Sequence, residues 1–287
     1  MEGLPLKRHQ ASAERANTRR LVAMELLLVA GLFLAYKLTR VMIGGSTSDA
    51  FVNARRILDL EGVLNLPSEV GVQRLMLESE TLTRMANGYY AFVHFPLTVA
   101  FLIWLFIRHR PQYFTVRTTL ALLTGMALVV HTLFPLAPGR MLGRRGFVDT
   151  AAMYGQSVYG APEQDSLSNQ FAAMPSLHFG WAVVVALGII TVTSSQLRWL
   201  WLLHPIVTLA VIVGTGNHYW LDALVAGLLL VLAYHIVAVR RMAQEPLQPR
   251  VVVGRSLPTQ TPAAYDWLSD SDPPLSSSRN LGRCRAA

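Results

Sequence analysis

The sequence predicts an all-α protein, a polytopic membrane helix bundle with about six transmembrane helices. Hydrophobic residues make up 52% of the 287 residues and charged residues only 15%, whereas about a quarter of an average soluble domain is charged. Apolar runs long enough to cross a bilayer as helices recur along the chain. Backbone polar groups inside lipid must be satisfied internally, so we expect these runs to be helices rather than open strands.

The first span is predicted over 21–43, after a polar and basic segment over 1–20. It is too long for a signal-peptide core and is not closed by a clean small-residue cleavage site. Apolar residues at helical spacing over 48–60 predict an amphipathic helix that lies on the membrane surface. Five further spans are predicted, over 85–107, 116–134, 175–192, 199–214 and 219–239.

These elements divide the chain into three parts: the basic segment 1–20, a membrane domain over 21–241 and a tail over 242–287. The tail is rich in Pro, Ser, Gln, Arg and Asp, so we expect it to be disordered. A long polar loop over 135–174 separates the third and fourth spans. We find no internal repeat.

The net charge of +8 comes from basic residues at the ends of apolar runs. This pattern favours anchoring to anionic lipid over nucleic-acid binding. The positive-inside rule predicts a multi-pass protein of the cell membrane with both termini in the cytoplasm and the long loop outside. The single cysteine, Cys284, excludes an intrachain disulfide and a cysteine metal site.

The first candidate for chemistry is a histidine and an aspartate four residues apart, His218 and Asp222, at the start of the last span. On a helix this spacing places both side chains on one face. The carboxylate can then accept a hydrogen bond from one imidazole nitrogen and leave the other free as a nucleophile. The alternative is a helix-start aspartate that complements the helix dipole, beside an unrelated histidine.

A second candidate is the segment Pro175-Ser176-Leu177-His178 at the start of the fourth span. Proline favours the first turn of a helix, and the free N–H groups of that turn can bind a phosphate oxygen, with the Ser176 hydroxyl as a further donor. We expect His178 at the same membrane depth as His218, where ionisable groups are functional candidates. The alternative is an ordinary helix start.

A third candidate is Arg140, which follows Pro135 and Pro138 where the third span leaves the membrane. A guanidinium held there can bind phosphate oxygens through its forked donors. Arg144 and Arg145 are possible substitutes, and headgroup anchoring is the competing interpretation. All three candidate segments fall at the outward ends of their predicted helices.

The order Arg140, then Pro175-Ser176-Leu177-His178, then His218-x3-Asp222 resembles the type 2 phosphatidic acid phosphatase superfamily of membrane enzymes. Met-Pro-Ser-Leu-His and Asn-His-Tyr-Trp-Leu-Asp are closer to its inositol phosphorylceramide synthase-like branch, over about residues 85–240. The resemblance implies a phosphatase or phosphotransferase that acts on a lipid phosphate or phospho-headgroup, without metal or other cofactor. It implies a phosphohistidine at His218, oriented by Asp222, with His178 as acid and base.

The sequence departs from the family in two places. It has no Lys-x6-Arg-Pro string, and Val211 and Ile212 stand where the family has Ser-Arg, so one phosphate-binding arginine is missing. Lys37 and Arg40, three residues apart on the first span, either reach the phosphate in its place or snorkel to the interface.

Two alternatives stay open. Water and a lipid hydroxyl can both accept a phosphoryl group, so hydrolysis alone competes with transfer, which the branch resemblance slightly favours. A non-catalytic transporter or scaffold with the same fold is the second alternative, although transporters typically show broken helices in repeated halves. The expected partner is a membrane lipid rather than nucleic acid, at an active site on the extracytoplasmic face. No oligomeric state is predicted.

Overall fold

The computed structural model describes residues 4–43, 47–155 and 170–244. All of them belong to the first of two compact units, Met1–Glu245. Among these residues the regular structure is helical, and the one β-type pairing is an isolated bridge between Leu136 and Ala172. The predicted all-α fold is therefore confirmed, while nearly all of the tail predicted over 242–287 lies outside the described residues.

Five helical stretches in the described part of the chain are long and apolar enough to cross a membrane. They lie in α1 (Leu4–Ile43), in the run of α4 (Glu80–Gly88), η1 (Tyr89–Val93) and α5 (His94–Arg108), in α6 (Arg110–Leu133), in the run of η4 (Gln196–Leu202) and α9 (Leu203–Gly214), and in α10 (Trp220–Gln244). The predicted fourth span is α8 (Leu177–Val192), an apolar helix of 16 residues. At about 1.5 Å per residue it is shorter than the hydrocarbon layer.

The polar segment after the first span contains two helices, α2 (Thr47–Val63) and α3 (Glu69–Leu77). The first is the predicted amphipathic helix, but its apolar face packs on the protein, because Ala54 and Ile57 are buried in a cluster with Leu136. The second was not predicted. Its N-cap, Ser68, accepts a hydrogen bond from the Gly71 N–H at 3.3 Å, which is a local helix-start signal.

The central helix of the bundle is α8, which packs against α5, α6, α9 and α10. Its Val184 and Val185 are fully buried in one cluster with Leu123 of α6. Large apolar side chains such as Leu27 and Leu228 are exposed on other helices, as expected where a helix faces lipid.

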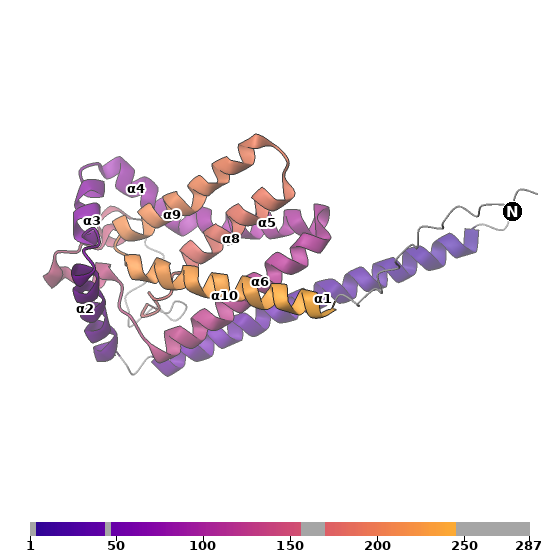
Figure 1. Ribbon diagram of the computed structural model, residues 1–287, viewed down its shortest axis with the longest axis horizontal. Coiled ribbons are helices and arrows are strands. Elements are labelled where there is room, and N and C mark those ends of the chain that lie inside the picture. The colour runs from indigo at the N-terminus through magenta and orange to yellow at the C-terminus, as the bar shows by residue number, and fades with distance from the viewer. Residues whose placement is uncertain (1–3, 44–46, 156–169, 245–287) are drawn as a thin grey trace, which may run out of the picture. The chain divides into compact units, whose positions relative to one another are not determined.

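Several helix ends meet at one end of the bundle, where α8 and α10 begin and α6 and α9 end. Figure 1 shows α2 and α3 at this end, and α2 contacts α10 while α3 contacts α9. The segment after α6 is fixed here by backbone hydrogen bonds from Leu136 to Phe171 (2.8 Å) and from Ala137 to Ala50 (3.1 Å). The three candidate segments are thus together, as predicted, and the membrane face on which they lie stays a prediction.

Candidate active site

His218 lies in the turn between α9 and α10, two residues before α10 begins. Its Nδ1 faces two acceptors, the Ala173 carbonyl oxygen at 2.7 Å and Asp222 Oδ2 at 3.2 Å. Because the closer partner, the Ala173 carbonyl, can only accept, the proton lies on Nδ1 and Nε2 keeps a free lone pair. The predicted contact with Asp222 is made, although His218 precedes the helix and the Ala173 carbonyl, which was not predicted, lies closer.

The environment of His218 favours its neutral form. Burial lowers the pKa of His218 to about 4; the hydrogen bond to Ala173 acts in the opposite direction and the charge of Arg140 in the same direction. A neutral imidazole at pH 7 is the nucleophilic form.

Asp222 is fully buried and joins the two histidine segments. Its Oδ2 also accepts the Tyr219 N–H at 2.9 Å, so the third residue of α10 caps its own helix start. Its carbonyl oxygen accepts the Ser176 N–H at 3.1 Å, just before α8. Both interpretations of Asp222, as a partner of His218 and as a helix-start residue, therefore apply.

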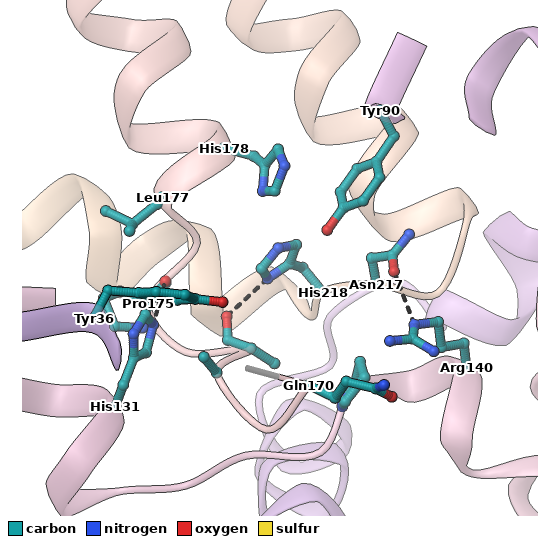
Figure 2. Close-up of a pocket in the computed structure, with 13 residues that line it drawn as sticks. Tyr36, Tyr90, His131, Arg140, Gln170, Pro175, Leu177, His178, Asn217 and His218 are labelled. Atoms are coloured by element: carbon teal, nitrogen blue, oxygen red, sulfur yellow. Dashed lines mark hydrogen bonds between the residues drawn. The ribbon is translucent and has the colours of Figure 1, made fainter. Parts of the chain in front are cut away.

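His178 is the second residue of α8, because this helix begins at Leu177 rather than at the predicted Pro175. Its ring is stacked on Tyr90 with 4.3 Å between centroids. The centroid of the His218 ring is 5.7 Å away. Figure 2 shows His178 on the side of His218 opposite to the hydrogen bond with Ala173, so the free nitrogen of His218 and the ring of His178 border the same space.

This space is a cavity of about 190 Å³. Its lining residues are Tyr36, Tyr90, His131, Pro138, Arg140, Gln170, Ala172, Ala173, Pro175, Leu177, His178, Asn217 and His218. Pockets that enclose drug-sized ligands measure about 300–1,000 Å³. The cavity therefore fits a group of the size of a phosphate or a small headgroup.

Arg140 is buried and reaches this cavity. Its Nε donates to Asn217 Oδ1 at 3.0 Å, and its Nη1 lies 3.3 Å from Asp149 Oδ2. Its backbone N–H donates to the Gly216 carbonyl at 2.7 Å. Gly216 has φ of 69°, and an added Cβ would lie 3.2 Å from the Arg140 nitrogen, so glycine there permits the close approach of Arg140 to the His218 turn.

Two predicted phosphate-binding residues, Ser176 and Lys37, are not among the residues that line the cavity. The Ser176 hydroxyl is fully buried and accepts the Phe179 N–H at 3.3 Å as the N-cap of α8. Lys37, whose Nζ lies 5.7 Å from the centroid of Phe33, is not among the cavity residues. The Arg40 side chain lies outside the described part of the chain. For Ser176 the reason is physical: a hydroxyl that caps its own helix is directed away from a ligand.

The backbone of the α8 start offers donors that replace the hydroxyl. The N–H groups of Leu177 and His178 precede the first hydrogen bond of the helix and have no helical acceptor. Both residues line the cavity. An anion site at this helix start stays a prediction, and these main-chain N–H groups are its candidate donors.

Several cavity residues were missed from the sequence. Figure 2 shows the Tyr90 hydroxyl pointing towards His218 and Asn217. His131 Nε2 lies 3.3 Å from the Pro175 carbonyl oxygen. Asn217 could have been found as the neighbour of His218, whereas Tyr90 is one aromatic residue in an apolar span. Within the described residues, no group of three or more His, Cys, Asp or Glu side chains could hold a metal ion.

Fold and site together define a multi-pass helical membrane protein in which three imidazoles and a buried guanidinium border one small cavity. The sequence model of the PAP2 superfamily matches residues 55–237, which is more than half of the chain. The protein belongs to the PAP2 superfamily, which indicates a phosphatase-type phosphoesterase. No curated protein and no solved structure matches the chain in the same comparisons.

Proposed function

We propose that the protein transfers the phosphoryl group of a membrane lipid phosphate, or its phospho-headgroup, through a phosphohistidine at His218 and without a metal. One observation carries the proposal: the Nδ1 side of His218 is occupied by Ala173 and Asp222. The lone pair of Nε2 is then the nucleophile that borders the cavity and His178.

In the first step, Nε2 of His218 forms a bond to phosphorus as the bond from phosphorus to the lipid alkoxide breaks. His178, in its protonated form, gives its proton to the departing alkoxide. Asp222 and the Ala173 carbonyl keep the proton on Nδ1 and stabilise the positive charge that develops on the ring. In the second step, neutral His178 takes a proton from the acceptor hydroxyl, whose oxygen bonds to phosphorus as the bond to His218 breaks.

Arg140 and the N–H groups of Leu177 and His178 stabilise negative charge on the phosphoryl oxygens in both steps. Asn217 and Asp149 hold the Arg140 guanidinium by its Nε and Nη1. The family's second phosphate-binding arginine is absent. In the proposed mechanism the Tyr90 hydroxyl and the Asn217 amide, which border the cavity, bind phosphoryl oxygens in its place. Lys37 and Arg40 remain predicted alternatives.

Arg140→Lys is expected to lower kcat/KM by about 10²-fold, because one ammonium cannot keep the contact with Asn217 and also reach the phosphate. The measurement is steady-state turnover in detergent. Arg144→Lys is the control, since Arg144 lies outside the cavity. Equal effects of the two substitutions would show that only net positive charge matters.

The nature of the acceptor separates two forms of this function. The resemblance to the inositol phosphorylceramide synthase-like branch supports transfer to a lipid hydroxyl, whereas water as acceptor gives a phosphatase. The test is turnover of a phospholipid panel by the purified full-length protein in detergent with a metal chelator. Free phosphate identifies hydrolysis and a new phosphorylated lipid identifies transfer. Complete loss of turnover on chelation contradicts the metal-free mechanism.

A further inference from the structure

Two buried glutamates lie beside the first turn of α10, outside the catalytic cavity. Glu61 lies near the end of α2 and Glu69 begins α3; they are 2% and 4% exposed. Glu61 Oε1 accepts the Leu221 N–H at 2.7 Å. Leu221 is the second residue of α10, so its N–H has no helical acceptor. A glutamate from α2 thus caps the helix that carries Asp222.

The second oxygens of the two glutamates are also buried. Glu61 Oε2 and Glu69 Oε1 have no hydrogen-bond partner of standard geometry among the described residues. Two carboxyl groups can form a hydrogen bond only when one of them carries a proton. Burial, followed by the contact with Glu69, raises the pKa of Glu61 from 4.5 to about 9. At neutral pH Glu61 therefore keeps a proton, which it can direct towards Glu69.

Two acidic or phenolic groups and one cation face this pair from neighbouring segments. Asp222 and Tyr219 face it from the start of α10, and burial raises the pKa of Tyr219, which stays neutral. A cation, Arg145, lines the adjacent cavity with both glutamates. Arg145 is half exposed and lies 3.5 Å from Asp59.

The start of α10 is held at further points by the link between α2 and α3 and by the segment after α6. The Trp220 Nε1 donates to the Pro67 carbonyl oxygen at 2.7 Å, in the link between the two helices. The Tyr219 hydroxyl donates to the Ala137 carbonyl oxygen at 2.8 Å, in the segment that leads to Arg140. The turn that carries His218 and Asp222 is therefore fixed from outside the transmembrane helices.

We propose that Glu61 is a positioning residue for the His218–Asp222 pair and acts as one half of an acid–carboxylate pair with Glu69. The proposal rests on the proposed function, in which His218 attacks phosphorus. Without Glu61, the Leu221 N–H loses its acceptor and the first turn of α10 can shift. A shift of this turn moves the nucleophile relative to Arg140 and His178, which come from other segments.

Glu61→Ala and Glu61→Gln separate positioning from simple folding. Alanine removes the acceptor, and we expect kcat to fall by up to about 10²-fold, the loss typical of a small misplacement, with KM little changed. Glutamine keeps an oxygen for Leu221 and donates its amide to Glu69, so kcat should stay close to the wild-type value. Glu78→Gln, an exposed position after α3, is the matched control.

The shared proton gives a second readout. Above pH 9 wild-type Glu61 loses its proton and a negative charge appears beside Glu69 and Asp222, so kcat should fall there in the wild type but not in Glu61→Gln. Between pH 4.5 and 9 the native protein binds more protons at Glu61 than the unfolded chain, so its stability falls as pH rises through this window. Glu61→Gln should lack this decline.

The experiment measures kcat, KM and the thermal unfolding midpoint of the full-length protein in detergent from pH 6 to 10. A wild-type kcat in Glu61→Ala overturns the positioning role. Parallel pH profiles of unfolding in wild type and Glu61→Gln overturn the shared proton. If the wild type cleaves no phosphoester, the proposed function fails, and the unfolding profiles still decide whether the acid pair exists.

Discussion

Replacing His218 by glutamine is expected to abolish turnover, with kcat reduced by about 10⁴-fold or more, as for other nucleophiles of covalent catalysis. The glutamine amide can still donate to the Ala173 carbonyl and fills most of the space of the imidazole, so the fold should be kept. It has no nitrogen lone pair that can attack phosphorus. The measurement is kcat of the purified protein with its preferred phospholipid.

The matched control is His235→Gln, an exposed histidine in the membrane helix α10. This variant should retain wild-type kcat and the same unfolding midpoint as His218→Gln. A His218→Gln protein that is folded and keeps a tenth of wild-type kcat contradicts the nucleophilic role.

Replacing His178 by glutamine is expected to lower kcat by about 10²–10⁴-fold, the usual contribution of a general acid and base. The loss should depend on the leaving group. An aryl phosphate has a weakly basic leaving group that needs no proton, so its first step should stay fast in the variant. The second step still needs a base, and the phosphoenzyme should accumulate.

In His178→Gln, the fast first step and the slow second step are measured by rapid mixing with the aryl phosphate. We expect a burst of phenol followed by a slow steady state. The wild-type protein should show a smaller burst, because His178 also speeds the second step. Loss of the burst in His178→Gln with the aryl substrate would assign His178 to binding rather than to proton transfer.

The features that the sequence predicts correctly are those with a local pattern. The length of an apolar run predicts a membrane helix, and all six predicted runs are helical in the structure. His218 and Asp222 are four residues apart, so their contact at 3.2 Å follows from local geometry even though His218 precedes the helix. Both histidine segments lie at the same end of the bundle, which follows from the order of the predicted spans along the chain.

The features that the sequence missed depend on contacts between distant segments. Glu61 and Leu221 are separated by 160 residues, and the Ala173 carbonyl that orients His218 belongs to a loop with no motif for that role. Ser176 was assigned to phosphate binding because a serine at a helix start can donate, but capping its own helix directs the hydroxyl elsewhere. The apolar face of α2 was predicted to lie on the membrane, because helical periodicity identifies an apolar face but not whether lipid or protein covers it.

The phosphoenzyme itself is the most direct test of the proposed chemistry. Purified full-length protein in detergent with a metal chelator is mixed with a substrate labelled in its phosphoryl group, quenched during turnover and digested to peptides. We expect a label that is stable in base, labile in acid and located on His218, and absent from His218→Gln. Turnover without a covalent label, or a label on another residue, would contradict attack by His218.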